Sequence, residues 1–128
     1  MSTYDNVQED PEWRPLRENG DARLYVIVRG DITKSQQAVQ AGHAIAQWCL
    51  TKNRYMVISS VFGTHWDNEF LILLKAKDHT DLCVWREKIR AKGFKWVEFK
   101  EPDMENQTTA VAAFGDGLSD FLQDLSLV

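Results

Sequence analysis

Polar side chains recur along one side of an otherwise apolar segment of this chain. The row is spaced by four, three and four residues and consists of Gln36, Gln40, His43 and Gln47. This spacing aligns side chains on one face of an α-helix. A histidine can exchange a proton near neutral pH, and glutamine amides beside it can orient water or a hydroxyl group. The row therefore predicts a hydrogen-bonding site on a rigid helix.

A strand and a loop must position this row. Residues 24–28, LYVIV, form a short apolar run rich in β-branched side chains, which is typical of a buried strand. The helix that follows continues to about Leu50. Its first turn can be capped by Asp31, Thr33 or Ser35. We therefore expect a strand, a loop and a helix in succession.

A second row on the same helix indicates which side packs against a sheet. One step around the helix stand Ala38, Gly42, Ile45 and Cys49. Because most of these side chains are small, they would let the helix approach a sheet closely. We therefore expect this row to be the buried one.

The rest of the chain alternates between strand and helix patterns. We expect further strands over residues 70–76, 94–100 and 108–114. Between the first two, residues 78–81 resemble a capping box, and Gly93 is a typical C-terminal cap. A short helix over residues 118–125 follows the last strand. The predicted fold class is α/β: a single three-layer domain with a four-stranded mixed sheet, helices on both faces, and the order β-α-β-α-β-β-α.

Length and composition fit one globular domain. The chain has 128 residues, of which 44% are hydrophobic. Residues 1–21 are polar and acidic and contain Pro11, Pro15 and Gly20, so we expect a flexible arm before a folded domain at residues 22–128. No apolar run approaches the roughly 18 residues that span a bilayer, and the N-terminus is unlike a secretory signal. We expect a cytoplasmic protein without a membrane partner.

Charge is distributed unevenly along the chain. The net charge is −4, but residues 22–100 carry 13 bases and 7 acids, whereas residues 101–128 carry six acids and no base. A basic centre is compatible with a partner that bears phosphate groups. The alternative is that the bases of the second helix only solvate its surface. They are Arg86, Lys88, Arg90 and Lys92.

Several kinds of site lack support. The loop before the first helix has neither G-x-G-x-x-G nor a P-loop motif, so a nucleotide would lack its phosphate cradle. His43, His65 and His79 do not have zinc-site spacing. We therefore expect neither a metal nor a cofactor. Cys49 and Cys83 fall in separate predicted helices, and we expect both to be reduced and packed.

Three segments together resemble the type 2 peptidyl-tRNA hydrolases. Residues 28–44, VRGDITKSQQAVQAGHA, are similar to that family's V-R-x-D-L-x-M-G-K-G-K-x-A-A-Q-x-x-H-A signature. Residues 70–78, FLILLKAKD, are similar to its V-V-L-K-V-K-D strand, and residues 108–115, TTAVAAFG, to its G-T-x-T-V-L-A-I-G strand. The resemblance covers about residues 23–125, so residues 22–128 are expected to be a type 2-like domain.

The resemblance implies a metal-independent hydrolase that cleaves the ester joining a peptide to the 3′ end of tRNA. It implies catalytic roles for Lys34, His43, Thr108 and a carboxylate. Lys34 would hold a phosphate or stabilise developing negative charge, and the family's aspartate in D-A-G-x-T would be replaced by Glu101 or Asp103. Residues implied in substrate binding are Gln36, Gln40, Arg29 and Asp31.

Two departures from the family pattern keep an alternative open. Gln36 stands in place of the second lysine of G-K-G-K and cannot supply its charge. The segment Glu-Pro-x-x-Glu-Asn at residues 101–106 is closer to a divergent branch, the peptidyl-tRNA hydrolase domain-containing proteins. The expected function is hydrolysis of peptidyl-tRNA or a related acylated tRNA. A homodimer is compatible with the sequence. The alternative is a non-catalytic module that binds tRNA or a protein on the same fold.

Overall fold

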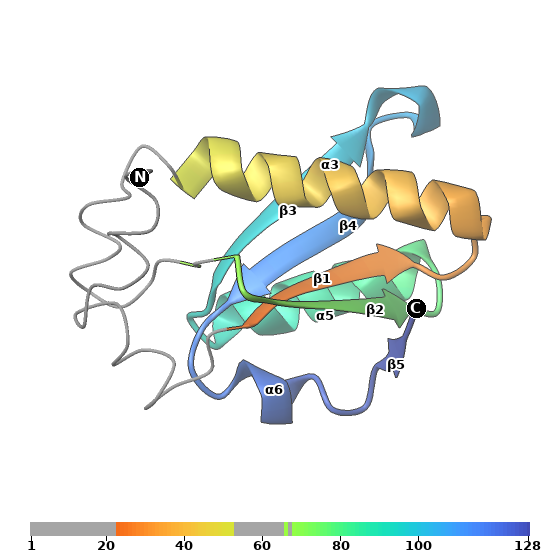
Figure 1. Cartoon of the computed structure of the whole chain (residues 1–128). Helices are drawn as coiled ribbons and strands as arrows, with labels where there is room; N and C mark the ends of the chain where they lie inside the picture. The colour runs from red at the N-terminus through yellow and green to blue at the C-terminus, as the bar shows by residue number, and fades with distance from the viewer. Residues whose placement is uncertain (1–22, 53–65, 67) are drawn as a thin grey trace, which may run out of the picture.

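The computed structural model describes residues 23–52, 66 and 68–128 (Figure 1). The arm expected over residues 1–21 lies outside these residues. The described part of the chain forms a mixed sheet covered by helices, so the α/β class is confirmed.

In the described part of the chain, five strands form the sheet, in the spatial order β3-β4-β1-β2-β5. Their bounds are β1 Arg23–Arg29, β2 Phe70–Ala76, β3 Lys95–Glu101, β4 Gln107–Phe114 and β5 Ser126–Leu127. Strands β1 and β2 pair in parallel, and every other pair is antiparallel.

The expectation of four strands is wrong because the chain adds a fifth at its end. The helix expected over residues 118–125 is only α6, Leu118–Phe121, and β5 then pairs with Leu74 and Lys75 of β2. A strand of two residues is too short to show an alternating pattern.

Helices cover both faces of the sheet (Figure 1). Helix α3, Lys34–Lys52, packs on one face, and α5, His79–Ala91, packs on the other together with α6. The sequence of β1 explains this arrangement, because its five central residues, 24–28, are all buried and point alternately to the two faces. Within the described part of the chain, no helix is both long and apolar enough to cross a membrane.

The helix ends follow local capping chemistry. Thr33 caps α3, since its Oγ1 accepts a hydrogen bond from the backbone N–H of Gln36 at 3.1 Å. The predicted N-terminal cap of α5 is confirmed, because the Asp78 carboxylate accepts from the backbone N–H of Asp81 at 2.9 Å. The return bond differs from that of a capping box, since Asp81 Oδ2 accepts from the backbone N–H of Lys77 at 2.9 Å. Gly93 follows the last turn of α5 with a left-handed φ of 84°, as expected of a C-terminal cap.

The buried side of α3 agrees only in part with the predicted row, of which Ile45 and Cys49 pack against the core as expected. Ala38 and Gly42 are exposed. The side chains that turn to the sheet are Gln37, Gln40, Ala41, Ala44 and Trp48. The large Trp48 ring packs among the core residues and fixes the rotation of the helix, which the row of small residues does not. Part of the polar row is therefore inside the protein.

Candidate functional site

Two neighbouring threonines of β4 face opposite sides of the sheet, and a bulge decides which of them faces α3. In the pairing of β3 with β4, Phe99 opposes Ala110 but Lys100 opposes Thr108, so Thr109 is an extra residue. Thr109 bonds to a side chain of α3, whereas Thr108 bonds to a side chain of α5. The bulge therefore places Thr109, like Ala110, on the α3 face and leaves Thr108 on the α5 face.

On the α3 face, Gln40 is a fully buried amide with both ends occupied. Its Oε1 accepts a hydrogen bond of 2.6 Å from Thr109 Oγ1, which is also fully buried. Its Nε2 donates over a longer 3.5 Å to Oε1 of the exposed Gln36. Two hydrogen bonds therefore link Thr109 at the bulge, through Gln40, to Gln36 at the protein surface.

His43 lies one turn further along α3 and is exposed. Its imidazole stacks on the ring of Phe99, with the ring centroids 4.3 Å apart and the planes at 11°. Among the described residues, no hydrogen bond reaches either ring nitrogen. Stacking thus fixes the plane of the imidazole while both nitrogens remain accessible to a ligand.

The two candidate acids occupy different positions. Glu101 is half-buried at the end of β3, and because it follows Phe99 by two residues it lies on the α3 face, about 7 Å along the strand. Asp103 is exposed in the 3₁₀ turn η3, Pro102–Met104. Alternation along β3 therefore favours Glu101 as the acid nearer to His43.

Lys34 is the first residue of α3 and is exposed. It precedes His43 by nine residues, which corresponds to about 13 Å along the helix axis. The two side chains therefore lie on the same helix but too far apart to contact each other.

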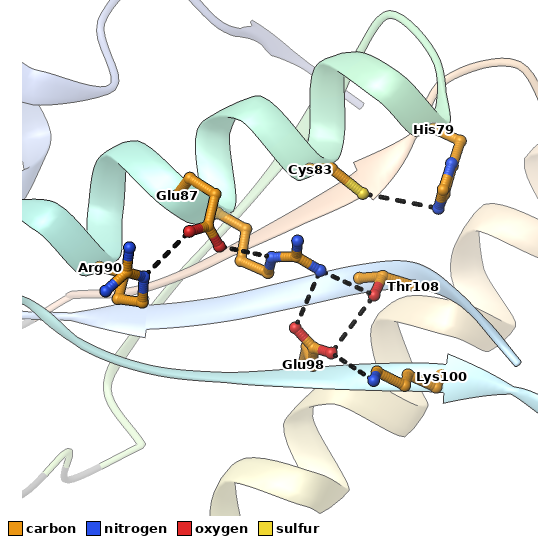
Figure 2. Close-up of polar contacts among 8 residues, drawn as sticks. His79, Cys83, Glu87, Arg90, Glu98, Lys100 and Thr108 are labelled. Carbon is orange, nitrogen blue, oxygen red and sulfur yellow. Dashed lines mark hydrogen bonds and ion pairs between the residues drawn. The ribbon is translucent and has the colours of Figure 1, made fainter.

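Thr108 lies on the α5 face, away from His43. Its Oγ1 accepts a hydrogen bond from Arg86 Nη1 at 3.3 Å and donates to Glu98 Oε1 at 3.4 Å (Figure 2). Glu98 also forms ion pairs with Arg86 at 3.3 Å and with Lys100 at 3.4 Å. The sheet therefore separates Thr108 from the imidazole, and the structure does not bring Lys34, His43, Thr108 and an acid together.

Arg29 and Asp31 hold the loop that leads into α3. Two nitrogens of Arg29 donate to the two carboxylate oxygens of Asp31, each at 2.9 Å, and a third donates to Gln107 Oε1 at 2.9 Å. This hydrogen-bonded pairing lowers the pKa of Asp31 and raises the pKa of Arg29. The pair ties the loop to the start of β4.

No protein-family model matches this chain, and no curated protein matches it significantly. In the described part of the chain, no three His, Cys, Asp or Glu side chains are grouped so as to hold a metal ion.

Sequence reasoning missed Thr109 and Phe99. Two consecutive threonines in a strand look equivalent, and which of them faces the helix depends on a bulge that no residue pattern marks. Phe99 was visible only as one apolar residue of an alternating strand. The site of the α3 face therefore consists of Gln36, Gln40, His43, Phe99, Glu101 and Thr109.

Proposed function

We propose that this chain hydrolyses the ester bond of peptidyl-tRNA, or of a related acylated tRNA, on the α3 face. The observation that carries the proposal is the accessible imidazole of His43, fixed by Phe99 one turn from the buried Gln40–Thr109 pair. A satisfied buried polar pair specifies one geometry of the surrounding side chains. The buried pair therefore helps to hold the neighbouring His43 imidazole at a fixed position, which a catalytic group needs.

The chemistry that we assign to this face is general-base hydrolysis. A ring nitrogen of His43 takes a proton from water, and the water oxygen attacks the ester carbonyl carbon. The bond from that carbon to the ribose oxygen breaks, and the proton passes to the ribose oxygen. Glu101 orients the water and Gln36 the terminal ribose.

Gln40 and Thr109 act as positioning residues in this scheme. Both are fully buried and bonded to each other, so neither reaches the substrate. Lys34 binds a backbone phosphate near the start of α3, since its side chain is exposed there, nine residues before His43.

The test is release of the acylated amino acid from N-acetyl-aminoacyl-tRNA by the purified chain. We expect His43→Gln, which keeps a hydrogen-bonding side chain but cannot take the proton, to lower kcat at least about 100-fold. Lys34→Ala is expected to raise KM with little change in kcat. Absence of hydrolysis by the parent protein would contradict the proposal.

The second candidate is a non-catalytic module that binds tRNA or a protein partner, and the surface of α5 favours it. Lys88 and Arg90 are exposed on that helix, Lys92 is exposed at its C-cap, and Lys88 lies 4.5 Å above the centre of the Trp85 ring. Several exposed cations on one helix can contact successive phosphates. This candidate predicts tRNA binding without hydrolysis.

Salt dependence separates the two candidates further. For the binding module, the affinity for tRNA falls steeply with ionic strength, and Lys88→Glu with Lys92→Glu weakens it. If the protein hydrolyses the substrate and these two substitutions leave the rate of hydrolysis unchanged, a binding module on α5 does not explain the function.

A further inference from the structure

A thiol and an imidazole meet on α5, apart from the α3 face. Cys83 Sγ lies 3.5 Å from His79 Nε2 (Figure 2). The two residues are four positions apart on the first two turns of the helix, and both are half-buried. A base in contact with a sulfur is the arrangement that activates cysteine as a nucleophile.

Positive charge faces this pair from two elements. The pKa of Arg29, on β1, is raised chiefly by the hydrogen bond to Asp31, with smaller contributions from Asp78 and Cys83. Burial lowers the pKa of Arg86, on α5, but the charge of Glu98 and the hydrogen bond and charge of Glu87 together outweigh this effect, so that the pKa is raised. Arg86 follows Cys83 by three residues on α5, so the two side chains lie on neighbouring turns of one helix face.

The carboxylates around the pair are already engaged with other groups. Asp31 bonds to Arg29, Asp78 caps the helix, and Glu98 pairs with Arg86 and Lys100. Each of these carboxylates thus has another partner, and among the described residues His79 is the side chain within hydrogen-bonding distance of the sulfur.

We propose that Cys83 is a nucleophilic thiol, activated by His79, that small hydroperoxides oxidise to a sulfenic acid. His79 Nε2 takes the thiol proton as the sulfur attacks the nearer peroxide oxygen. The S–O bond forms, the O–O bond breaks, and the departing oxygen leaves with that proton as water or an alcohol. Sulfur loses two electrons and the peroxide gains them.

The half-buried position of the sulfur explains the choice of reactant. A hydroperoxide is small enough to reach a thiol of which only part is exposed, and its leaving oxygen needs only one proton, which His79 supplies. The reaction needs no group beyond this pair and the peroxide.

Cys49 provides an internal comparison. It is also half-buried in a helix and also free, but it packs against the apolar core on the α3 face. The sheet lies between the two cysteines, so they cannot approach to the Cα separation of less than about 7 Å that a disulfide requires. The oxidised Cys83 therefore stays a sulfenic acid or is capped by a small thiol.

The experiment treats the full chain with hydrogen peroxide in the presence of dimedone, which traps sulfenic acids. Mass spectrometry of the two cysteine-containing peptides gives a separate rate for each site. We expect Cys83 to be labelled at least about tenfold faster than Cys49. His79→Ala and His79→Gln are both expected to lower the Cys83 rate about tenfold, because a glutamine amide can contact sulfur but cannot take its proton.

The control variant is His43→Ala, which removes an imidazole from the opposite face and should leave the Cys83 rate unchanged. Equal rates at the two cysteines in the parent protein would overturn the proposal. So would a Cys83 rate that survives both His79 substitutions while circular dichroism shows an intact fold.

Discussion

Helices α3 and α5 cover opposite faces of one sheet, yet they use different interactions. Between Lys34 and Lys52, α3 contains no Asp, Glu, Lys or Arg, and its polar contacts are made by amides and hydroxyls. Helix α5 has five such charged residues over a shorter length, and ion pairs hold Arg86 and Arg90.

The difference teaches what each face is suited for. A hydrogen bond between uncharged buried groups is directional and brings no net charge, so it can fix a geometry beside a reacting ester. Ion pairs at a half-exposed surface stabilise less and depend on salt, but the charges that remain outside them can attract phosphate. The α3 face is accordingly the proposed reaction surface.

The largest effect is expected from the buried pair on the α3 face. Gln40→Met leaves Thr109 Oγ1 without its buried partner, and Thr109→Val does the same to the Gln40 carbonyl. Each substitution should lower the free energy of unfolding by about 2–3 kcal/mol, measured by urea denaturation. The double variant should lose less than the sum, and strict additivity would show that the bond does not couple the two residues.

A smaller effect is expected from the ion pairs of α5. Among the described residues, Arg86→Met leaves Lys100 as the charged partner of the largely buried Glu98 carboxylate, and we expect a loss of about 1–2 kcal/mol. Arg90→Met is the matched control, because its pair with Glu87 is exposed and should contribute clearly less to the free energy of unfolding. Equal losses of unfolding free energy in the two variants would contradict the claim that the less exposed Arg86–Glu98 pair stabilises the fold more than the exposed Arg90–Glu87 pair.

The smallest effect concerns the loop before α3. Because the folded pKa of Asp31 lies below its unfolded value, the Arg29 pair adds stability above about pH 4, and this stability is lost as the pH falls through the folded pKa. Asp31→Asn should therefore cost less than about 1 kcal/mol at pH 7, since the carboxylate is partly exposed. Urea unfolding at pH 7 and at pH 3 checks this, and a cost that persists at the lower pH would contradict the electrostatic explanation.

Much of the fold is predictable from local chemistry. The β-branched run of β1, the capping residue Asp78 and the terminal Gly93 all behave as their residue types indicate. These features depend on residues close together in the chain.

The missed features depend on residues far apart in the chain. The rotation of α3 is fixed by the packing of Trp48 against Phe114, and the direction of Thr109 by a shift in pairing with β3. Strand β5 forms only because β2 offers it an edge. The sequence therefore identifies His43 and Gln40 as candidates but does not tell which of them is exposed.

The most direct test compares one imidazole from each face in the hydrolysis of N-acetyl-aminoacyl-tRNA. We predict that His43→Ala lowers kcat at least about 100-fold, whereas His79→Ala stays within about twofold of the parent protein. A loss caused by His79→Ala with His43→Ala fully active would place the reaction on the α5 face and contradict the account.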